Sequence, residues 1–108
     1  MKATIIELDT VEKLDELIKL SEEKPVLLFK HSITCPISDH VYREVSDVDE
    51  NVNLVIVQTA RAISNEIEAR TGIRHQSPQA IVLKDGKAIY NASHYDITAE
   101  DLEKSLKS

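Results

Sequence analysis

The strongest constraint on the fold is a pair of short, almost wholly apolar runs, VLLF (26–29) and NLVIV (53–57). A strand that is apolar at nearly every position is expected where both faces of a sheet are covered. Between the two runs, Ile37, Val41 and Val45 recur at helical spacing. A helix that connects two such strands forms a right-handed βαβ unit. The sequence therefore predicts an α/β fold with helices on both faces of the sheet.

The N-terminal segment adds a further strand and a further helix. TIIEL (4–8) is typical of a short strand, and apolar side chains follow at helical spacing between residues 11 and 20. Asp9 and Glu12 are spaced like a capping box, so we expect Asp9 to cap this helix. Pro25 then separates the helix from the first apolar run.

The C-terminal half begins with a third helix and continues into a hairpin. Thr59 is placed to cap that helix, and Gly72 stands where a helix commonly ends. Residues 80–90 (AIVLKDGKAIY) form two apolar runs around Asp85-Gly86, a dipeptide that favours a type I′ turn. The sheet is therefore expected to close with an antiparallel pair of strands.

A last helix is expected to begin at Thr98, because Asp101 follows at the spacing of an N-terminal cap. The elements then number about five strands, in a mixed sheet with helices on both faces. There is no repeat and no linker. We expect residues 1–108 to form one domain.

Composition and charge argue against several kinds of partner. The 108-residue chain has a formal net charge of −6 and no basic block, so we expect no nucleic-acid ligand. No apolar run is long enough for a membrane span or a signal peptide, and we expect no membrane partner. One cysteine cannot build a disulfide framework. These features predict a cytoplasmic protein.

The segment HSITCPISDH contains the single cysteine, Cys35. A lone cysteine is commonly a small buried apolar side chain. Here, Thr34 precedes it in a loop-like stretch, and Pro36 suits the first position of a helix. The free N–H groups at a helix start favour a thiolate and lower the pKa of a nearby thiol. We interpret Cys35 as a nucleophile, and Lys30 and His31 either as added positive charge or as a solvated strand end.

Metal binding is a weaker interpretation of the same segment. The residues with possible ligand atoms are His31, Cys35, Asp39 and His40. They lack the paired CxxC or HxxxH spacing of established sites, so we expect no metal. A cysteine protease would need a distant His and Asn, and usually a larger scaffold.

Several motifs together resemble one protein family. The motifs are TCPIS after VLLFKHS, the later SPQ, and the hairpin with LKDGK. In these motifs the sequence resembles the monothiol bacilliredoxins of the thioredoxin superfamily, the YtxJ-like proteins. The resemblance covers essentially the whole chain and implies a thioredoxin-like fold. The WCGPC motif of ordinary thioredoxins is absent, and so is the CGC-type site of other bacilliredoxins.

The resemblance implies that the protein removes bacillithiol, a small thiol, from mixed disulfides on other proteins. Cys35 would be the nucleophile, and Ser38 stands where a resolving cysteine would be. Ser77 and Pro78 would bind the substrate, with a cis peptide bond between them. On the residues alone, the commoner use of a proline such as Pro78 is in an ordinary loop before an edge strand.

The same resemblance implies the co-substrate and the partners. Bacillithiol would act as co-substrate, and no bound cofactor is expected. Partners would be bacillithiolated proteins, with another bacilliredoxin or a reductase to regenerate Cys35. The groups expected to bind the carboxylates of bacillithiol are Lys30, Arg74, His75 and the loop Ser93-His94.

Two alternatives remain open. Ser38 either donates a hydrogen bond to the thiolate or is a solvent-facing residue of the first helical turn. The protein is either a thiol–disulfide oxidoreductase or a non-catalytic thioredoxin-like module that binds a partner. In the second case, Cys35 is only a site of redox modification.

Overall fold

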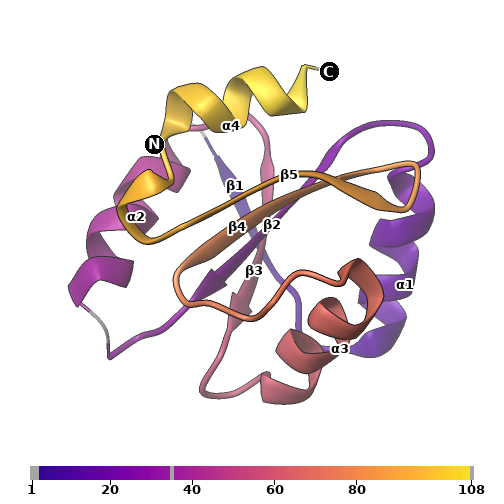
Figure 1. The fold of residues 1–108 in the computed structure, drawn as a ribbon, viewed down its shortest axis with the longest axis horizontal. Coiled ribbons are helices and arrows are strands. Elements are labelled where there is room, and N and C mark those ends of the chain that lie inside the picture. The colour runs from indigo at the N-terminus through magenta and orange to yellow at the C-terminus, as the bar shows by residue number, and fades with distance from the viewer. Residues whose placement is uncertain (1–2, 35, 108) are drawn as a thin grey trace.

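A computed structural model describes residues 3–34 and 36–107 of the chain (Figure 1). The strands are β1 (Thr4–Glu7), β2 (Val26–His31), β3 (Asn51–Ile56), β4 (Gln79–Lys84) and β5 (Lys87–Ser93). They form one five-stranded sheet in the order β1-β3-β2-β4-β5. The strand β3 runs parallel to both of its neighbours, whereas the β2–β4 and β4–β5 pairs are antiparallel. The predicted mixed sheet is confirmed.

Within residues 3–34 and 36–107, four α-helices and one short 3₁₀ helix cover the sheet. They are α1 (Val11–Leu20), α2 (Pro36–Ser46), α3 (Arg61–Thr71), the 3₁₀ helix η1 (His94–Asp96) and α4 (Ala99–Leu106). Figure 1 shows α1 and α3 together on one side of the sheet and α2 and α4 on the other. The α/β fold with helices on both faces is therefore confirmed. None of the helices in the described parts of the chain is both long and apolar enough to cross a membrane.

The central strand β2 supplies both halves of the core because all of its residues are buried. Leu27 and Phe29 face α2 and α4, where they pack in one apolar cluster with Val41. The alternate side chain, Leu28, belongs to the cluster under α1 and α3, which includes Ile67. Successive side chains of a strand point to opposite faces. A continuous apolar run is thus what this central position requires.

The predicted turns and the last helix cap are confirmed. Asp85 and Gly86, between β4 and β5, both have positive φ angles, 54° and 74°, as a type I′ turn demands. Gly72 ends α3 in the left-handed conformation with φ 73°. Thr98 caps α4, since its side chain accepts a hydrogen bond from the backbone N–H of Asp101.

Two of the predicted caps are wrong. Thr10, not Asp9, caps α1, because the backbone N–H of Lys13 donates to Thr10 Oγ1 at 3.2 Å. Asp9 instead pairs with the ammonium of Lys13 at 2.9 Å. At the third helix, the cap is Ala60, which makes no side-chain bond, and Thr59 lies one residue too early. Neighbouring residues compete for each cap, and the sequence does not decide between them.

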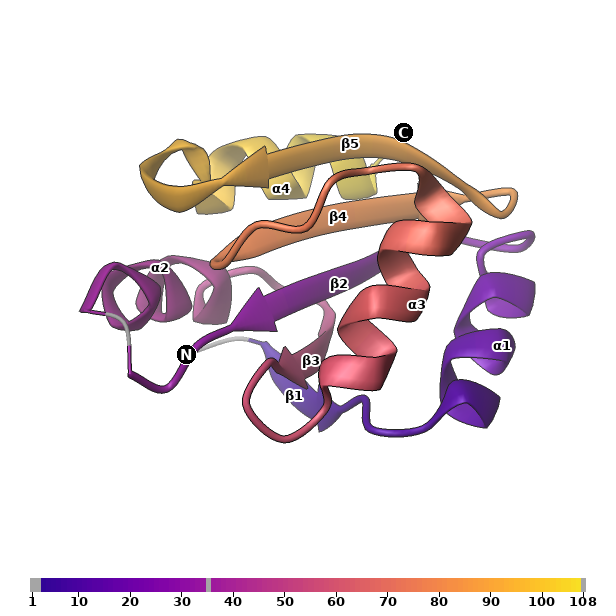
Figure 2. The same ribbon diagram turned by 60° about the horizontal axis from the view of Figure 1, so that its bottom comes forward.

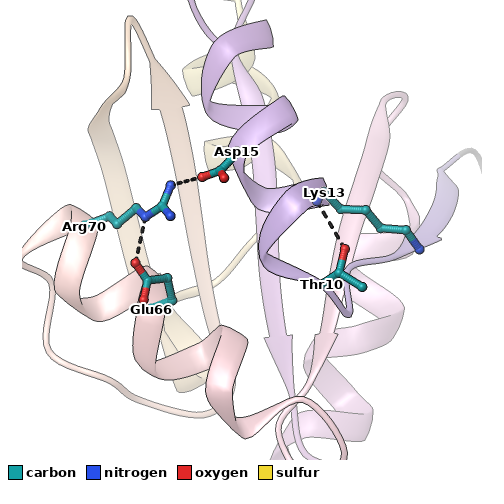
Figure 3. A network of polar contacts seen from close by, with 5 residues as sticks. All are labelled: Thr10, Lys13, Asp15, Glu66 and Arg70. Atoms are coloured by element: carbon teal, nitrogen blue, oxygen red, sulfur yellow. Dashed lines mark hydrogen bonds and ion pairs between the residues drawn. The ribbon is translucent and has the colours of Figure 1, made fainter.

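An ion-pair network joins the two helices on the α1/α3 face (Figure 3). Arg70 of α3 donates to Asp15 of α1 and, at 2.8 Å, to Glu66 within its own helix. The partners are partly exposed, and exposed pairs contribute little to stability. The network therefore helps to fix how α1 and α3 lie against each other. Most of the free energy that stabilises their packing comes from the apolar cluster beneath them.

Candidate active site

The candidate site lies where β2 ends and α2 begins. Cys35 itself is outside the described residues. Pro36 is the first residue of α2, as predicted, and Thr34 is an exposed residue of the preceding loop. In Figure 2, the end of β2, the start of β4 and the helix α2 all lie at one end of the sheet.

The Ser77–Pro78 peptide bond is cis, as the resemblance implied. The antiparallel register pairs Lys30 with Gln79, so Pro78 lies beside the end of β2. The backbone N–H of His94 donates to Pro78 O at 3.0 Å, which joins the turn after β5 to the same region. The Ser77 hydroxyl is buried and has no partner among the described residues. Its part in substrate binding stays a prediction.

Ser38 is fully buried in the first turn of α2. Its Oγ accepts the backbone N–H of Ser32 at 3.0 Å. The interpretation of Ser38 as a solvent-facing residue is therefore wrong. A hydroxyl that accepts one hydrogen bond keeps its own O–H for donation. Whether that O–H serves the thiolate stays a prediction, because Cys35 is not described.

A residue that the sequence analysis missed, Gln58, contacts the loop before Cys35. The side chain of Gln58 accepts from Ile33 N at 3.2 Å and donates to Ser32 Oγ at 2.7 Å. Its Nε2 also donates to Thr34 Oγ1 at 3.2 Å, and these two residues are 24 positions apart in the sequence. A single polar residue after an apolar strand carries no sequence signal for such a contact.

Lys30 is neither a solvated strand end nor an exposed cation, since it is only 1% exposed. Its Nζ donates to Ser64 O and to His75 Nδ1, each at 3.2 Å. Burial lowers the pKa of this ammonium, and the carboxylate of Glu68 acts in the opposite direction. The ammonium is thus occupied beneath α3, which removes Lys30 from the groups expected to bind a carboxylate.

His75 lies in the segment before Pro78 and is the second hydrogen-bond partner of Lys30. Its Nδ1 also lies 3.0 Å from Ser64 Oγ, and its backbone N–H donates to Glu68 at 2.6 Å. An ammonium can only donate, so with Lys30 charged the Nδ1 atom of His75 is the acceptor in this contact. Burial, followed by the charge of Lys30, lowers the pKa of His75.

The other two groups expected to bind carboxylates, Arg74 and His94, are exposed. The backbone carbonyl of Arg74 accepts from Gln79 Nε2 at 3.0 Å, which fixes the chain there and leaves the guanidinium outside. His94 adopts a positive φ of 55°, an uncommon conformation for a residue other than glycine. Both residues remain candidates for binding an anionic group.

His31, the last residue of β2, is also buried rather than solvated. Its ring contacts those of Phe29 and Tyr42, with ring centroids 5.9 and 5.0 Å away, and these two rings also contact each other. The Nδ1 atom is buried and has no partner among the described residues. Burial lowers the pKa of His31, and the charge of Asp39 partly opposes this. Within residues 3–34 and 36–107, no three His, Cys, Asp or Glu side chains gather as metal ligands would.

We expect His31→Phe to make folding less sensitive to acid. In the native protein His31 binds a proton less readily than in the unfolded chain, where its pKa is about 6.5. Stability from the neutral ring is therefore complete above about pH 6.5 and is lost as pH falls through the native pKa. Urea unfolding at several pH values between about 5 and 8 should show a shallower slope for the variant. Equal slopes would contradict the prediction, and His75 should leave part of the slope in both proteins.

Comparison with known proteins supports a thiol redox role. Residues 6–102 match the sequence profile of the family described as Monothiol bacilliredoxin BrxC. A solved protein, described as a proposed oxidoreductase with a thioredoxin fold, is 33% identical, with a TM-score of 0.84 over 94% of this chain and 92% of that one. Mitochondrial thioredoxin 3 of Saccharomyces cerevisiae is 18% identical, with a TM-score of 0.71 over 95% and 93% of the two chains. Thioredoxin of Trypanosoma brucei brucei is 13% identical, with a TM-score of 0.75 over 99% and 91%, and shows the fold alone.

Proposed function

Because the chain belongs to the monothiol bacilliredoxin family, we propose that it removes bacillithiol from mixed disulfides on other proteins through Cys35. The observation that carries the proposal is the place of the only cysteine, directly before the first residue of α2. The first N–H groups of a helix have no partner within the helix, and they favour a negative charge. A thiol in this position is suited to react as a thiolate.

The proposed reaction is a thiol–disulfide exchange in which no electrons are lost or gained overall. The Cys35 thiolate attacks the bacillithiol sulfur of the mixed disulfide. The bond between bacillithiol and the substrate protein breaks, and a new disulfide forms between bacillithiol and Cys35. The substrate thiolate leaves and takes up a proton from water. Its departure is faster when its own pKa is low.

Regeneration requires a thiol from outside the chain, because the sequence has no second cysteine. A second bacillithiol attacks the Cys35 adduct and leaves as bacillithiol disulfide, or another bacilliredoxin or a reductase supplies the thiol. Bacillithiol is then a co-substrate, and no bound cofactor takes part. A reducing compartment such as the cytoplasm suits this chemistry, because thiols stay reduced there.

The test is mass spectrometry of the protein after incubation with a bacillithiolated reporter protein. We expect the mass of one bacillithiol to appear on the peptide that contains Cys35, together with release of the reporter thiol. Alkylation of Cys35 at graded pH provides the second measurement. If no adduct forms, and if Cys35 is alkylated with the pH dependence of an ordinary thiol of pKa about 8.5, the results support the non-catalytic binding module instead.

A further inference from the structure

Gln58 lies in the turn after β3, directly beside the loop that leads to Cys35. The backbone N–H of Val57 donates to His31 O at 3.0 Å, which brings this turn against the end of β2. Gln58 follows Val57, and its side chain reaches the next three residues of the loop. It contacts Ser32, Ile33 and Thr34.

Every polar atom of the Gln58 amide has a partner in this loop. The oxygen accepts from the backbone N–H of Ile33, and this contact fixes which end of the amide is the oxygen. The two hydrogens on Nε2 then go to Ser32 Oγ and Thr34 Oγ1, at 2.7 and 3.2 Å. Ser32 Oγ and Thr34 Oγ1 also lie 3.3 Å apart. One side chain thus holds three consecutive residues.

The loop is held from its other side by α2. The backbone N–H of Ser32 donates to the buried Ser38 Oγ at 3.0 Å. Ile33, by contrast, is 59% exposed, so its side chain provides little packing to hold the loop. In this loop, hydrogen bonds to Gln58 and Ser38 therefore take the place of the apolar contacts that fix β2.

We propose that Gln58 is a positioning residue that holds Ser32–Thr34, and through them the thiol of the next residue, at the start of α2. The inference rests on the proposed function, because it assumes that Cys35 reacts there. Reaction rates fall steeply when a reacting group is misplaced by about 1 Å. Gln58 acts through the loop, since the contacts that the structure describes for its side chain are to Ser32, Ile33 and Thr34.

Gln58→Met tests the proposal, because methionine has a similar length but cannot make the three hydrogen bonds. Thr59→Ala is the matched control, since the Thr59 hydroxyl donates to Ile56 O at 3.4 Å and makes no bond to Ser32, Ile33 or Thr34. Three quantities are measured for each protein. They are the exchange rate of the Ile33 amide, the rate constant for adduct formation with a bacillithiolated reporter, and the pH midpoint of Cys35 alkylation.

We expect Gln58→Met to speed exchange of the Ile33 amide about tenfold, because that N–H loses its partner. Adduct formation should slow by about tenfold or more, and the alkylation midpoint should move toward that of an ordinary thiol, about 8.5. Thr59→Ala should leave all three quantities as in the wild type. Urea unfolding of each protein checks that it stays folded in these assays, because an unfolded thiol would itself titrate at about 8.5.

The inference is overturned if any of the three quantities is unchanged in Gln58→Met while the wild type forms the adduct. In that event the proposed function stands. If the wild-type protein itself forms no adduct, the proposed function fails, and the positioning role fails with it.

Discussion

Cys35→Ala is expected to abolish the release of reporter thiol from a bacillithiolated protein. Cys35 is the only thiol in the chain, so no other side chain can form the mixed disulfide with bacillithiol. Serine and threonine hydroxyls, such as that of Thr34, are poor nucleophiles without a neighbouring base. The measurement is the rate of thiol release at a fixed concentration of bacillithiol, compared with the rate without protein. Activity above that background in the variant would rule out Cys35 as the nucleophile.

Ser38→Ala is the companion variant. It should stay clearly active, although loss of the Ser32–Ser38 bond, which also holds the loop before Cys35, should slow the reaction to about the extent expected for Gln58→Met. A monothiol reaction needs no second nucleophile at position 38. The structure adds an expected cost to stability, because the Ser32 N–H loses its acceptor inside the protein. A buried donor without a partner costs about 1–3 kcal/mol. If Ser38→Ala were as inactive as Cys35→Ala while still folded, the monothiol mechanism would be wrong.

Phe29→Ala is expected to lower the free energy of unfolding by about 3–5 kcal/mol. Phe29 is 0% exposed, and its ring packs at 6.1 Å from that of Tyr42 on α2. Removing the ring leaves a cavity under the helix that begins beside Cys35. The total free energy of unfolding of a native protein is about 5–15 kcal/mol, so this loss is a large share of the stability. Urea unfolding at neutral pH measures it.

Ile89→Ala is the matched control for that measurement. Ile89 is also a large apolar residue on a strand, but it is 45% exposed on β5. Exposed positions of this kind change stability by about 0.5 kcal/mol or less. Equal losses in Ile89→Ala and Phe29→Ala would show that the ring of Phe29 does not support the core as described.

The fold could be predicted from the sequence because its strongest signals are local. The apolar run 26–29, bounded by Pro25, favours a strand covered on both faces, and Asp85-Gly86 favours a tight turn. The wrong helix caps have the same local origin, since Asp9 and Thr10 are both good caps and stand side by side. A choice between such neighbours depends on how the chain enters the helix.

The candidate site was predicted less completely because it depends on contacts between distant segments. A charged residue at the end of a strand is usually solvated, yet Lys30 is buried under α3, where Ser64 and His75 accept its hydrogens. Gln58 meets Ile33 across 25 residues of sequence. These contacts exist only once the sheet has formed, and no spacing rule along the chain expresses them.

The hydrogen bond between Ser32 and Ser38 also bears on how a two-cysteine enzyme could arise from this chain. A cysteine in place of Ser38 would bring a larger sulfur into a fully buried position, and sulfur accepts hydrogen bonds weakly. The Ser32 N–H would then lack a strong acceptor inside the protein. Engineering or evolution toward an internal disulfide would therefore have to rebuild the loop before the helix together with the new thiol. In this protein a serine at position 38 therefore also serves the backbone, because it accepts the Ser32 N–H at the start of the loop.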